Sequence, residues 1–250
     1  MTQVIPHPKM SRAELVALMA MMFATIAFSI DAMLPALPEI AQELTPQDLT
    51  RAPLILTAFV LGMGVGTFFA GPLSDAFGRR TMMFAGAGLY CTSAAVAWSS
   101  QSLEVMLIAR VAQGLGAAGP RVVSVAIIRD LFSGREMARI LSIVMMIFTI
   151  VPAFAPAMGV VIIATSGWRG IFIAFIVFSL ISALWLGLRL PETLPREHRR
   201  PLRLGLMKNA VGQMFAHPTV RLSILVQTLV ILIVLVAVLY LVLRLMTGAL

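Results

Sequence analysis

Long apolar segments alternate with short polar loops along most of this chain of 250 residues. A helix that crosses a bilayer needs about 20 consecutive, mainly apolar residues. Seven segments meet that requirement, approximately 14–36, 52–72, 81–100, 103–125, 138–163, 168–189 and 221–244. The pattern predicts an all-α membrane protein in which a bundle of six helices is followed by a seventh transmembrane helix.

The stretch between the sixth and seventh segments differs from the shorter loops before it. It is rich in Arg and Pro, and no apolar run of membrane length lies within it. We therefore expect three parts: a six-helix half at residues 1–190, a cytoplasmic linker at 191–220, and the seventh helix with the terminus at 221–250.

The distribution of Lys and Arg predicts the orientation in the membrane. Most basic residues fall in loops on one side of the predicted helices, whereas Arg51 and Arg169 fall on the other. Cytoplasmic loops carry an excess of Lys and Arg, so the N-terminus is expected in the cytoplasm. This topology suits a multi-pass protein of the inner (plasma) membrane of a cell.

Composition supports the membrane assignment and excludes several other classes. The chain is 60% hydrophobic and 12% charged, whereas soluble domains carry roughly 25% charged residues. The net charge of +8 follows the loop bias described above, so we expect no nucleic-acid partner. Lys9 and Lys208 lie outside the predicted helices, which excludes a retinal Schiff base in the last one.

The sequence also shows no motif that is typical of an enzyme or a metal site. Cys91 is the only cysteine, and the three His residues are not spaced as metal ligands. No nucleotide-binding loop and no Ser-His-Asp arrangement is evident. The expectation is a protein that is not an enzyme and that uses no cofactor and no metal.

The loop at residues 71–80, GPLSDAFGRR, concentrates residues with strong backbone preferences. Gly71 and Pro72 are expected to end the second helix, because Pro cannot continue the hydrogen-bond ladder. Ser74 or Asp75 is expected to cap the third helix, whose dipole favours an acid at its N-terminus.

The end of the same loop carries a glycine and two basic residues. Gly78 suits a close approach or a positive φ. Arg79 and Arg80 follow it directly and are expected to anchor at the cytoplasmic headgroups.

The fourth segment carries an arginine inside a predicted span. Arg110, Gln113 and Gly114 are three or four residues apart and therefore share one helix face. A guanidinium within a membrane is costly, so it should face the interior of the bundle and have a partner. The Gly and Ala residues around it are expected to let helices approach closely.

Asp31 is the acid that we expect to be that partner. It lies about 24 Å along the first helix from the inner surface, and Arg110 lies roughly 10 Å below the outer one, so their depths are similar. We predict that the two side chains share a central cavity, where a carboxyl opened alternately to each side can carry a proton. The alternative is that Asp31 only ends the first helix near Pro35.

The fifth segment contains a repeated proline pattern. In VPAFAPAMG, residues Pro152, Pro156 and Gly159 are spaced at i, i+4 and i+7, on one helix face. Two prolines free backbone carbonyls and bend a helix. The alternative is a kinked packing helix with no special role.

These motifs resemble those of the major facilitator superfamily. The loop at 71–80 is similar to its G-x-L-[AS]-D-[RK]-x-G-R-[RK] pattern, with Ala76 in place of the usual basic residue. The RVAQGLG run in the fourth segment is similar to R-x-x-Q-G-x-[GA], and the fifth segment resembles the signature of the exporters, with Ala155 where Gly usually precedes Pro. The DAMLP run at 31–35 resembles the bicyclomycin-resistance type of drug:proton antiporter.

The resemblance implies twelve helices in two related halves, with the substrate between them and the loop charges latching the halves together. It implies proton-coupled efflux of small lipophilic drugs or metabolites, with protons, a small-molecule substrate and the bilayer as partners. The substrate cavity would be lined by the first, second, fourth and fifth helices, and Met22, Phe28, Met33 and Met146 are candidate contacts. Since one half is present, we expect a truncated chain that lacks a C-terminal half. The alternatives are a sugar or metabolite transporter of the same fold, and an inactive or partner-binding membrane fragment.

Overall fold

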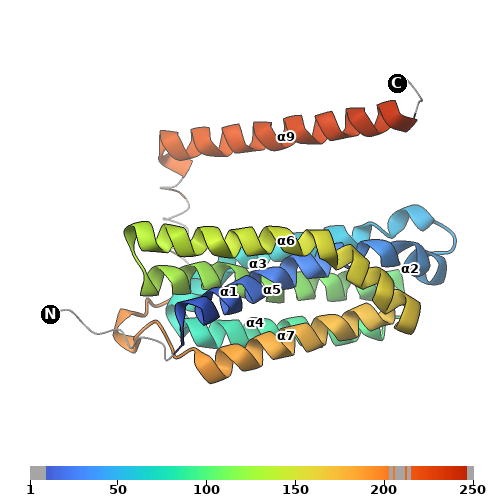
Figure 1. The fold of residues 1–250 in the computed structure, drawn as a ribbon. Coiled ribbons are helices and arrows are strands. Elements are labelled where there is room, and N and C mark those ends of the chain that lie inside the picture. The colour runs from blue at the N-terminus through green and yellow to red at the C-terminus, as the bar shows by residue number, and fades with distance from the viewer. Residues whose placement is uncertain (1–9, 203–204, 206–211, 213–214, 247–250) are drawn as a thin grey trace. The chain divides into compact units, whose positions relative to one another are not determined.

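A computed structural model describes residues 10–202, 205, 212 and 215–246 (Figure 1). These residues form helices joined by short connections, and no β-strand occurs among them. The chain divides into two units, one ending at Pro201 and one beginning at Leu202, and each is described by itself. The prediction of an all-α protein is confirmed.

The long helices of the first unit are α1 (Arg12–Asp31), α3 (Leu54–Phe77), α4 (Arg79–Trp98), α5 (Leu103–Leu131), α6 (Gly134–Ser166) and α7 (Arg169–Arg189). Its short helices are η1 (Leu34–Ala36), α2 (Leu37–Leu44), η2 (Leu49–Arg51) and η3 (Arg196–His198). In the second unit, α9 spans Pro218–Met246.

Several of these helices are suited to a bilayer. Four stretches of the described residues are long and apolar enough to cross one: Arg12–Leu44, Leu49–Phe77, Leu103–Leu131 and Gly134–Arg189. The last of them contains two helices, α6 and α7, separated by a turn at Gly167 with a φ of 65°. Seven separate spans therefore stay a prediction, whereas the apolar helical character of the chain is established.

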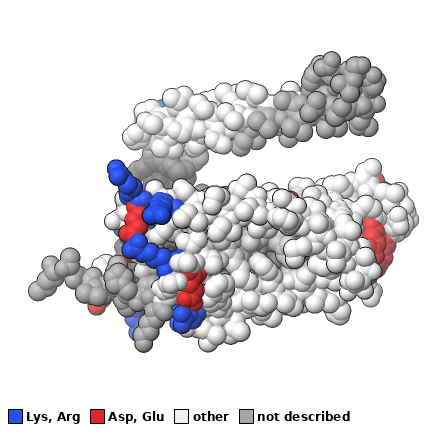
Figure 2. All heavy atoms as spheres, viewed as in Figure 1, with Lys and Arg blue, Asp and Glu red and all other residues white. Residues whose placement is uncertain are grey.

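Ion pairs identify the two ends of the first unit. At one end, Arg12 in the first turn of α1 pairs with Glu136 in the first turn of α6, at 2.7 Å. At the other end, Arg169 at the start of α7 pairs with Glu43 of α2, also at 2.7 Å. Figure 2 shows, on the visible face of this unit, basic side chains gathered at the end where α1 begins. We call this the basic end.

The predicted end of the second span is wrong. Pro72 lies inside α3, which continues to Phe77 and ends at Gly78, whose φ is 99°. Pro72 lacks the N–H that would donate to the carbonyl of Phe68. Beside it, the Ser74 hydroxyl donates to the carbonyl of Gly71 at 2.8 Å. The positive φ predicted for Gly78 is confirmed.

Glycines bring α5 into backbone contact with α3. A Cβ atom added at Gly62 of α3 would lie 2.0 Å from the carbonyl oxygen of Val111. One added at Gly114 of α5 would lie 2.1 Å from the carbonyl oxygen of Phe59. Close approach of this kind gives van der Waals contact over the length of a helix pair, which is the main source of packing energy in a membrane.

The same helix approaches α4 in the same way. A Cβ atom at Gly116 of α5 would lie 2.6 Å from the amide nitrogen of Tyr90 and 2.7 Å from the carbonyl oxygen of Gly86. α5 also contacts α1 and α6, so it lies at the centre of the first unit. The expectation that small residues of the fourth span permit close packing is confirmed.

Helix α6 bends in its C-terminal half, as Figure 1 shows. Pro152 and Pro156 lie inside this helix, and each removes an N–H donor from the ladder. Beyond them, a Cβ atom at Gly159 would lie 2.4 Å from the carbonyl oxygen of Ala32. Gly159 therefore fixes the far part of α6 against the end of α1, while Pro152 is exposed.

We expect a methyl group at Gly62 to destabilise the fold and one at Gly64 to have little effect. Gly62→Ala forces the backbones of α3 and α5 apart, which should cost about 1–3 kcal/mol of unfolding free energy. Nothing lies within 4 Å of a Cβ at Gly64 on the same helix. Gly64→Ala should therefore be neutral or stabilising by up to about 1 kcal/mol. Titration of the purified chain with SDS, followed by circular dichroism, measures both, and equal effects would contradict the packing described.

Candidate functional site

Arg110 is fully buried in the first third of α5, with no exposed surface. Its guanidinium donates to the carbonyl of Ser29 in α1 at 3.0 Å and to that of Ile55 in α3 at 3.4 Å. It also donates to Oε1 of Gln113, one turn along α5, at 2.7 Å. The guanidinium carbon lies 4.4 Å from the centre of the Phe59 ring, within the range of a cation–π contact. One cation therefore joins three helices.

Ser29 links this cation to α4. Its hydroxyl donates to the carbonyl of Thr25 at 2.6 Å and lies 2.5 Å from the hydroxyl oxygen of Tyr90. A serine hydroxyl has a single proton, so the Tyr90 hydroxyl is the donor in the second contact. Both Ser29 and Tyr90 are buried. We call Ser29, Tyr90, Arg110 and Gln113 the central polar cluster.

The structure does not bring Asp31 into an ion pair with Arg110. Asp31 is the last residue of α1 and is partly exposed. In the described part of the chain neither side chain takes part in a salt bridge within 4.0 Å. The predicted contact of Arg110 with α1 exists, but its acceptor is the backbone carbonyl of Ser29, two residues earlier.

Gln113 has an unused donor within the same cluster. Its oxygen accepts from Arg110, but its buried Nε2 atom has no hydrogen-bond partner among the described residues. A buried amide nitrogen without an acceptor costs about 1–3 kcal/mol. The cluster is therefore incomplete, and an acceptor that reached Nε2 would be stabilised there.

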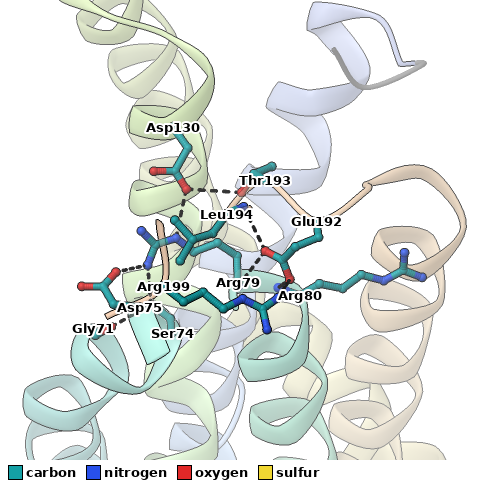
Figure 3. Close-up of polar contacts among 10 residues, drawn as sticks. All are labelled: Gly71, Ser74, Asp75, Arg79, Arg80, Asp130, Glu192, Thr193, Leu194 and Arg199. Carbon is teal, nitrogen blue, oxygen red and sulfur yellow. Dashed lines mark hydrogen bonds and ion pairs between the residues drawn. The ribbon is translucent and has the colours of Figure 1, made fainter. Parts of the chain in front are cut away.

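A second group of polar side chains lies at the basic end (Figure 3). Arg79 follows the turn at Gly78, and only 8% of its surface is exposed. Its guanidinium donates to Asp130 at the end of α5 at 2.9 Å, and to Asp75 and Ser74 of α3. The expectation that Arg79 anchors at the headgroups is wrong, because its charge is used inside the protein.

The expected capping of the third span is also corrected. Neither Ser74 nor Asp75 caps α4, because both belong to the last turn of α3. Instead, the carboxylate of Glu192 accepts from the backbone N–H groups of Arg79 at 2.9 Å and Arg80 at 3.2 Å. A distant acid thus caps α4 from the segment that follows α7 (Figure 3).

Further bonds tie that segment to the loop. Thr193 donates to Asp130 at 3.3 Å, and the N–H of Arg200 donates to the carbonyl of Asp75 at 3.1 Å. Arg80 donates to the carbonyl of Gly187 in α7 at 2.5 Å. We call Asp75, Arg79, Arg80, Asp130, Glu192 and Thr193 the loop cluster.

The sequence motifs assigned no role to two members of the loop cluster. Asp130 and Glu192 had no predicted role, although both are acids at the end of the bundle that carries the basic residues. Pairing these acids with the buried Arg79 would have required knowing which helix ends are neighbours. Gly71, in contrast, is only partly buried, and a Cβ there would meet a single atom, Cγ1 of Val122, at 3.9 Å.

An open cleft of about 630 Å³, which we call the central cleft, runs between α1, α3, α5 and α6. These are the predicted first, second, fourth and fifth helices, which were expected to line a cavity. The walls include Ile26, Met63 and Met145, and the basic end of the cleft carries Arg79 and Arg121. Met22, Phe28 and Met33 are buried in the core and do not line it, and neither does Met146, so these four expected contacts are wrong.

Comparison with known proteins identifies relatives of this chain. A family model described as Major Facilitator Superfamily matches residues 17–249. The chain is 33% identical over 205 residues to the uncharacterized MFS-type transporter YdgK of Bacillus subtilis, covering 81% of this chain and 51% of that protein. It is 32% identical over 201 residues to the bicyclomycin resistance protein homolog of Haemophilus influenzae, covering 76% and 50%.

Solved structures share the fold. A D-xylose-proton symporter aligns with a TM-score of 0.64 at 18% identity, over 82% of this chain and 52% of that one. The human organic anion transporter MFSD10 aligns with a TM-score of 0.61 at 21% identity, over 78% and 51%. The chain spans about half the length of the relatives that it matches.

We expect Arg110→Lys to destabilise the protein although it keeps the charge. A lysine has one donor nitrogen and cannot reach acceptors on three helices in the way that a guanidinium fork does. Losing one bond from a charged donor should cost roughly 1.5–3 kcal/mol in an SDS unfolding titration. Arg121→Lys, at an exposed position of the same helix, should change stability by less than about 0.5 kcal/mol. Equal stabilities of the two variants would refute the role of the three acceptors.

Glu192→Gln should loosen the start of α4. Each carboxylate oxygen of Glu192 accepts from one of the two N–H groups. Glutamine replaces one of these oxygens with an NH₂ group and removes the negative charge, so the cap is weakened. If the loss of cap stability is about 0.5–2 kcal/mol, hydrogen exchange at Arg79 and Arg80 should be roughly 2- to 30-fold faster. Mass spectrometry of peptides containing these amides measures it. Glu39→Gln, an exposed acid of α2, is the control, and unchanged exchange in Glu192→Gln would show that the cap is not needed.

Proposed function

The chain belongs to the Major Facilitator Superfamily, as its motifs predicted, and from this premise we propose that it is half of a proton-coupled exporter. Its cargo would be small lipophilic drugs or metabolites. The observation that carries the proposal is the central polar cluster, whose cation Arg110 is fully buried within the helix bundle. A charged group inside a membrane bundle is rare and typically marks an ion or substrate pathway.

Similar proteins support efflux as the direction of transport. The relatives include a bicyclomycin resistance protein homolog, multidrug resistance proteins named MdtL, and a chloramphenicol resistance protein of Pseudomonas aeruginosa. The last is 32% identical over 174 residues. The solved structures lie below 25% identity, and their likeness concerns the fold alone.

Asp31 is the proton carrier in this proposal, and Arg110 positions the helix that carries it. The bond from Arg110 to the carbonyl of Ser29 fixes α1 two residues before Asp31. Asp31 is partly exposed and has no salt bridge in the described part of the chain, so protons can reach its carboxyl. Gln113 provides the free Nε2 donor, which a substrate oxygen could accept.

The loop cluster and the bent helix supply the moving parts of the proposal. Gly71, Asp75, Gly78, Arg79 and Arg80 hold the α3–α4 connection, and their ion pairs would break or reform as the cleft changes shape. The face at Pro152, Pro156 and Gly159 is assigned to antiport, because the bend lets one part of α6 stay fixed to α1 while the other adjusts.

The remaining proposals concern location and partners. The basic end holds the side chains that the positive-inside rule assigns to the cytoplasm, so α1 would start there and the protein would lie in the inner membrane. Alternating access requires two bodies around one site. The partner would therefore be a second half, supplied by a longer chain or a separate one.

The test is proton flux driven by a drug gradient in vesicles that contain the purified chain. The wild-type chain should move protons, and Asp31→Asn, which keeps the size but loses the titratable group, should reduce the flux at least about tenfold. Asp48→Asn, an exposed acid outside the long helices, serves as the matched control and should leave the flux unchanged.

Each outcome distinguishes between the proposed functions of the chain. Equal flux in wild type and Asp31→Asn removes Asp31 from the mechanism. Flux no greater than in protein-free vesicles shows that the chain alone is not a transporter, which favours the inactive or partner-binding fragment. Flux driven by a sugar gradient but not by a drug gradient favours the sugar transporter.

A further inference from the structure

A second hollow lies between α1 and α6 at the basic end. Its volume is about 710 Å³, larger than that of the central cleft. It is open along one side, and its lining comes from the first two turns of α1 and the first four of α6. We call it the α1–α6 groove, and the central polar cluster and the loop cluster contribute no residue to it.

The side chains that line the groove form a charged end and an apolar wall. Arg12, Arg135, Glu136 and Arg139 line the charged end. The wall consists of aliphatic side chains: Ala13, Val16, Ala17, Ile140, Ile143 and Ile147. The lining residues of α6 recur every three or four positions, so they lie on one face of the helix. The charged residues lie nearest the start of the helix, and the aliphatic residues follow them.

The charged end has unused positive charge. Arg12 pairs with Glu136 across the groove, which leaves the two other arginines. Arg135 and Arg139 are exposed, and within the ranges that the structure describes neither takes part in an ion pair or a hydrogen bond. The first turn of α6 adds to this potential, because its N-cap Ser133 makes no side-chain capping bond and the helix dipole is positive there.

The groove does not open into the central cleft. On α6 the cleft is lined by Met145 and Phe148, whereas the groove is lined by Ile143 and Ile147. At about 100° of rotation per residue, Ile143 and Phe148 point roughly 140° apart. The two hollows therefore flank α6 on different sides, and a molecule in the groove would not occupy the substrate path.

We propose that the α1–α6 groove binds an anionic phospholipid of the cytoplasmic leaflet. The phosphate lies between Arg135 and Arg139, and one acyl chain follows the aliphatic wall towards the membrane centre. Basic pockets between helices on the cytoplasmic side are suited to anionic headgroups, and that leaflet is where such lipids are rich. The segment from Ile140 to Ile147 is about 10 Å long, enough for the upper part of a chain. A soluble anion would use the arginines but leave the wall uncovered.

The proposal does not depend on the direction of transport or on the proton carrier. It depends on net positive charge and an apolar wall in one groove. Its test therefore measures lipid binding, which can fail while the transport proposal stands, and the reverse also holds.

The experiment is native mass spectrometry of the purified chain, transferred from micelles that contain equal amounts of phosphatidylglycerol and phosphatidylcholine. The wild-type chain should retain phosphatidylglycerol in preference to phosphatidylcholine. The double variant Arg135→Gln/Arg139→Gln should weaken that retention roughly 30-fold, since each basic residue at a membrane surface contributes about fivefold. Its helix content by circular dichroism should be unchanged, because both side chains are exposed.

Two further variants distinguish lipid binding in the groove from a general attraction of anionic lipid to basic side chains. Arg121→Gln/Arg129→Gln removes the same charge from the cleft on the other side of α6, and it should leave phosphatidylglycerol retention unchanged. Ile143→Trp keeps all the arginines but fills the wall, and it should weaken retention at least fivefold.

Three results would overturn the proposal. Equal losses in the two double variants would mean that lipid follows surface charge alone. Unchanged retention in Ile143→Trp would mean that no acyl chain lies in the groove. No preference for phosphatidylglycerol in the wild type, or no loss in Arg135→Gln/Arg139→Gln, would mean that another occupant, such as a segment of protein, covers the groove.

Discussion

A guanidinium without a carboxylate lies at the centre of the first unit, and the helix packing accommodates it. The positive charge of Arg110 is stabilised by backbone carbonyls of two other helices, by one amide oxygen and by an aromatic face. These groups stabilise the charge only at short distance, so the helices that carry them must lie close to Arg110. The backbone contact at Gly62 and Gly114 brings the α3 ring of Phe59 and the carbonyl of Ile55 within reach. The glycines and the arginine thus form one arrangement, in which the charge requires the close approach that the missing side chains permit.

The sequence predicted the helices because a bilayer requires long apolar runs, and it predicted local pairs because helix geometry is regular. Arg110 and Gln113 were placed on one face and do bond to each other. The partner on α1 was predicted at the right depth but wrongly identified. Depth follows from rise per residue, whereas the direction of a side chain follows from rotation. Residues two apart point about 160° away from each other, so α1 can present Ser29 to α5 while Asp31 points elsewhere.

The loop cluster shows a second limit of local patterns. Gly71 and Pro72 are helix-ending residues by every local preference, yet α3 continues through them. The helix ends only at Gly78, and the contacts that hold the start of α4 beyond it come from far along the chain. Glu192 is separated by 113 residues from Arg79, which it caps. Gly78 was predicted because a positive φ is a property of one residue, whereas a cap from another helix end is a property of the fold.

The position of α6 connects the two hollows of the first unit. Beyond its prolines the helix is fixed to α1, since Gly159 meets the backbone at Ala32. Before them it is bordered by the central cleft on one side and the α1–α6 groove on another. At this end the Arg12–Glu136 ion pair joins it to α1. The Arg12 side chain is 77% exposed and that of Glu136 42%, so the pair is weak. A shift of the first half of α6 towards the groove would widen the cleft, and a lipid bound in the groove would oppose that shift. Occupancy of the groove and the width of the cleft would therefore be linked through one bent helix. A lipid that binds more tightly at one cleft width would favour that width by the difference between its two binding free energies.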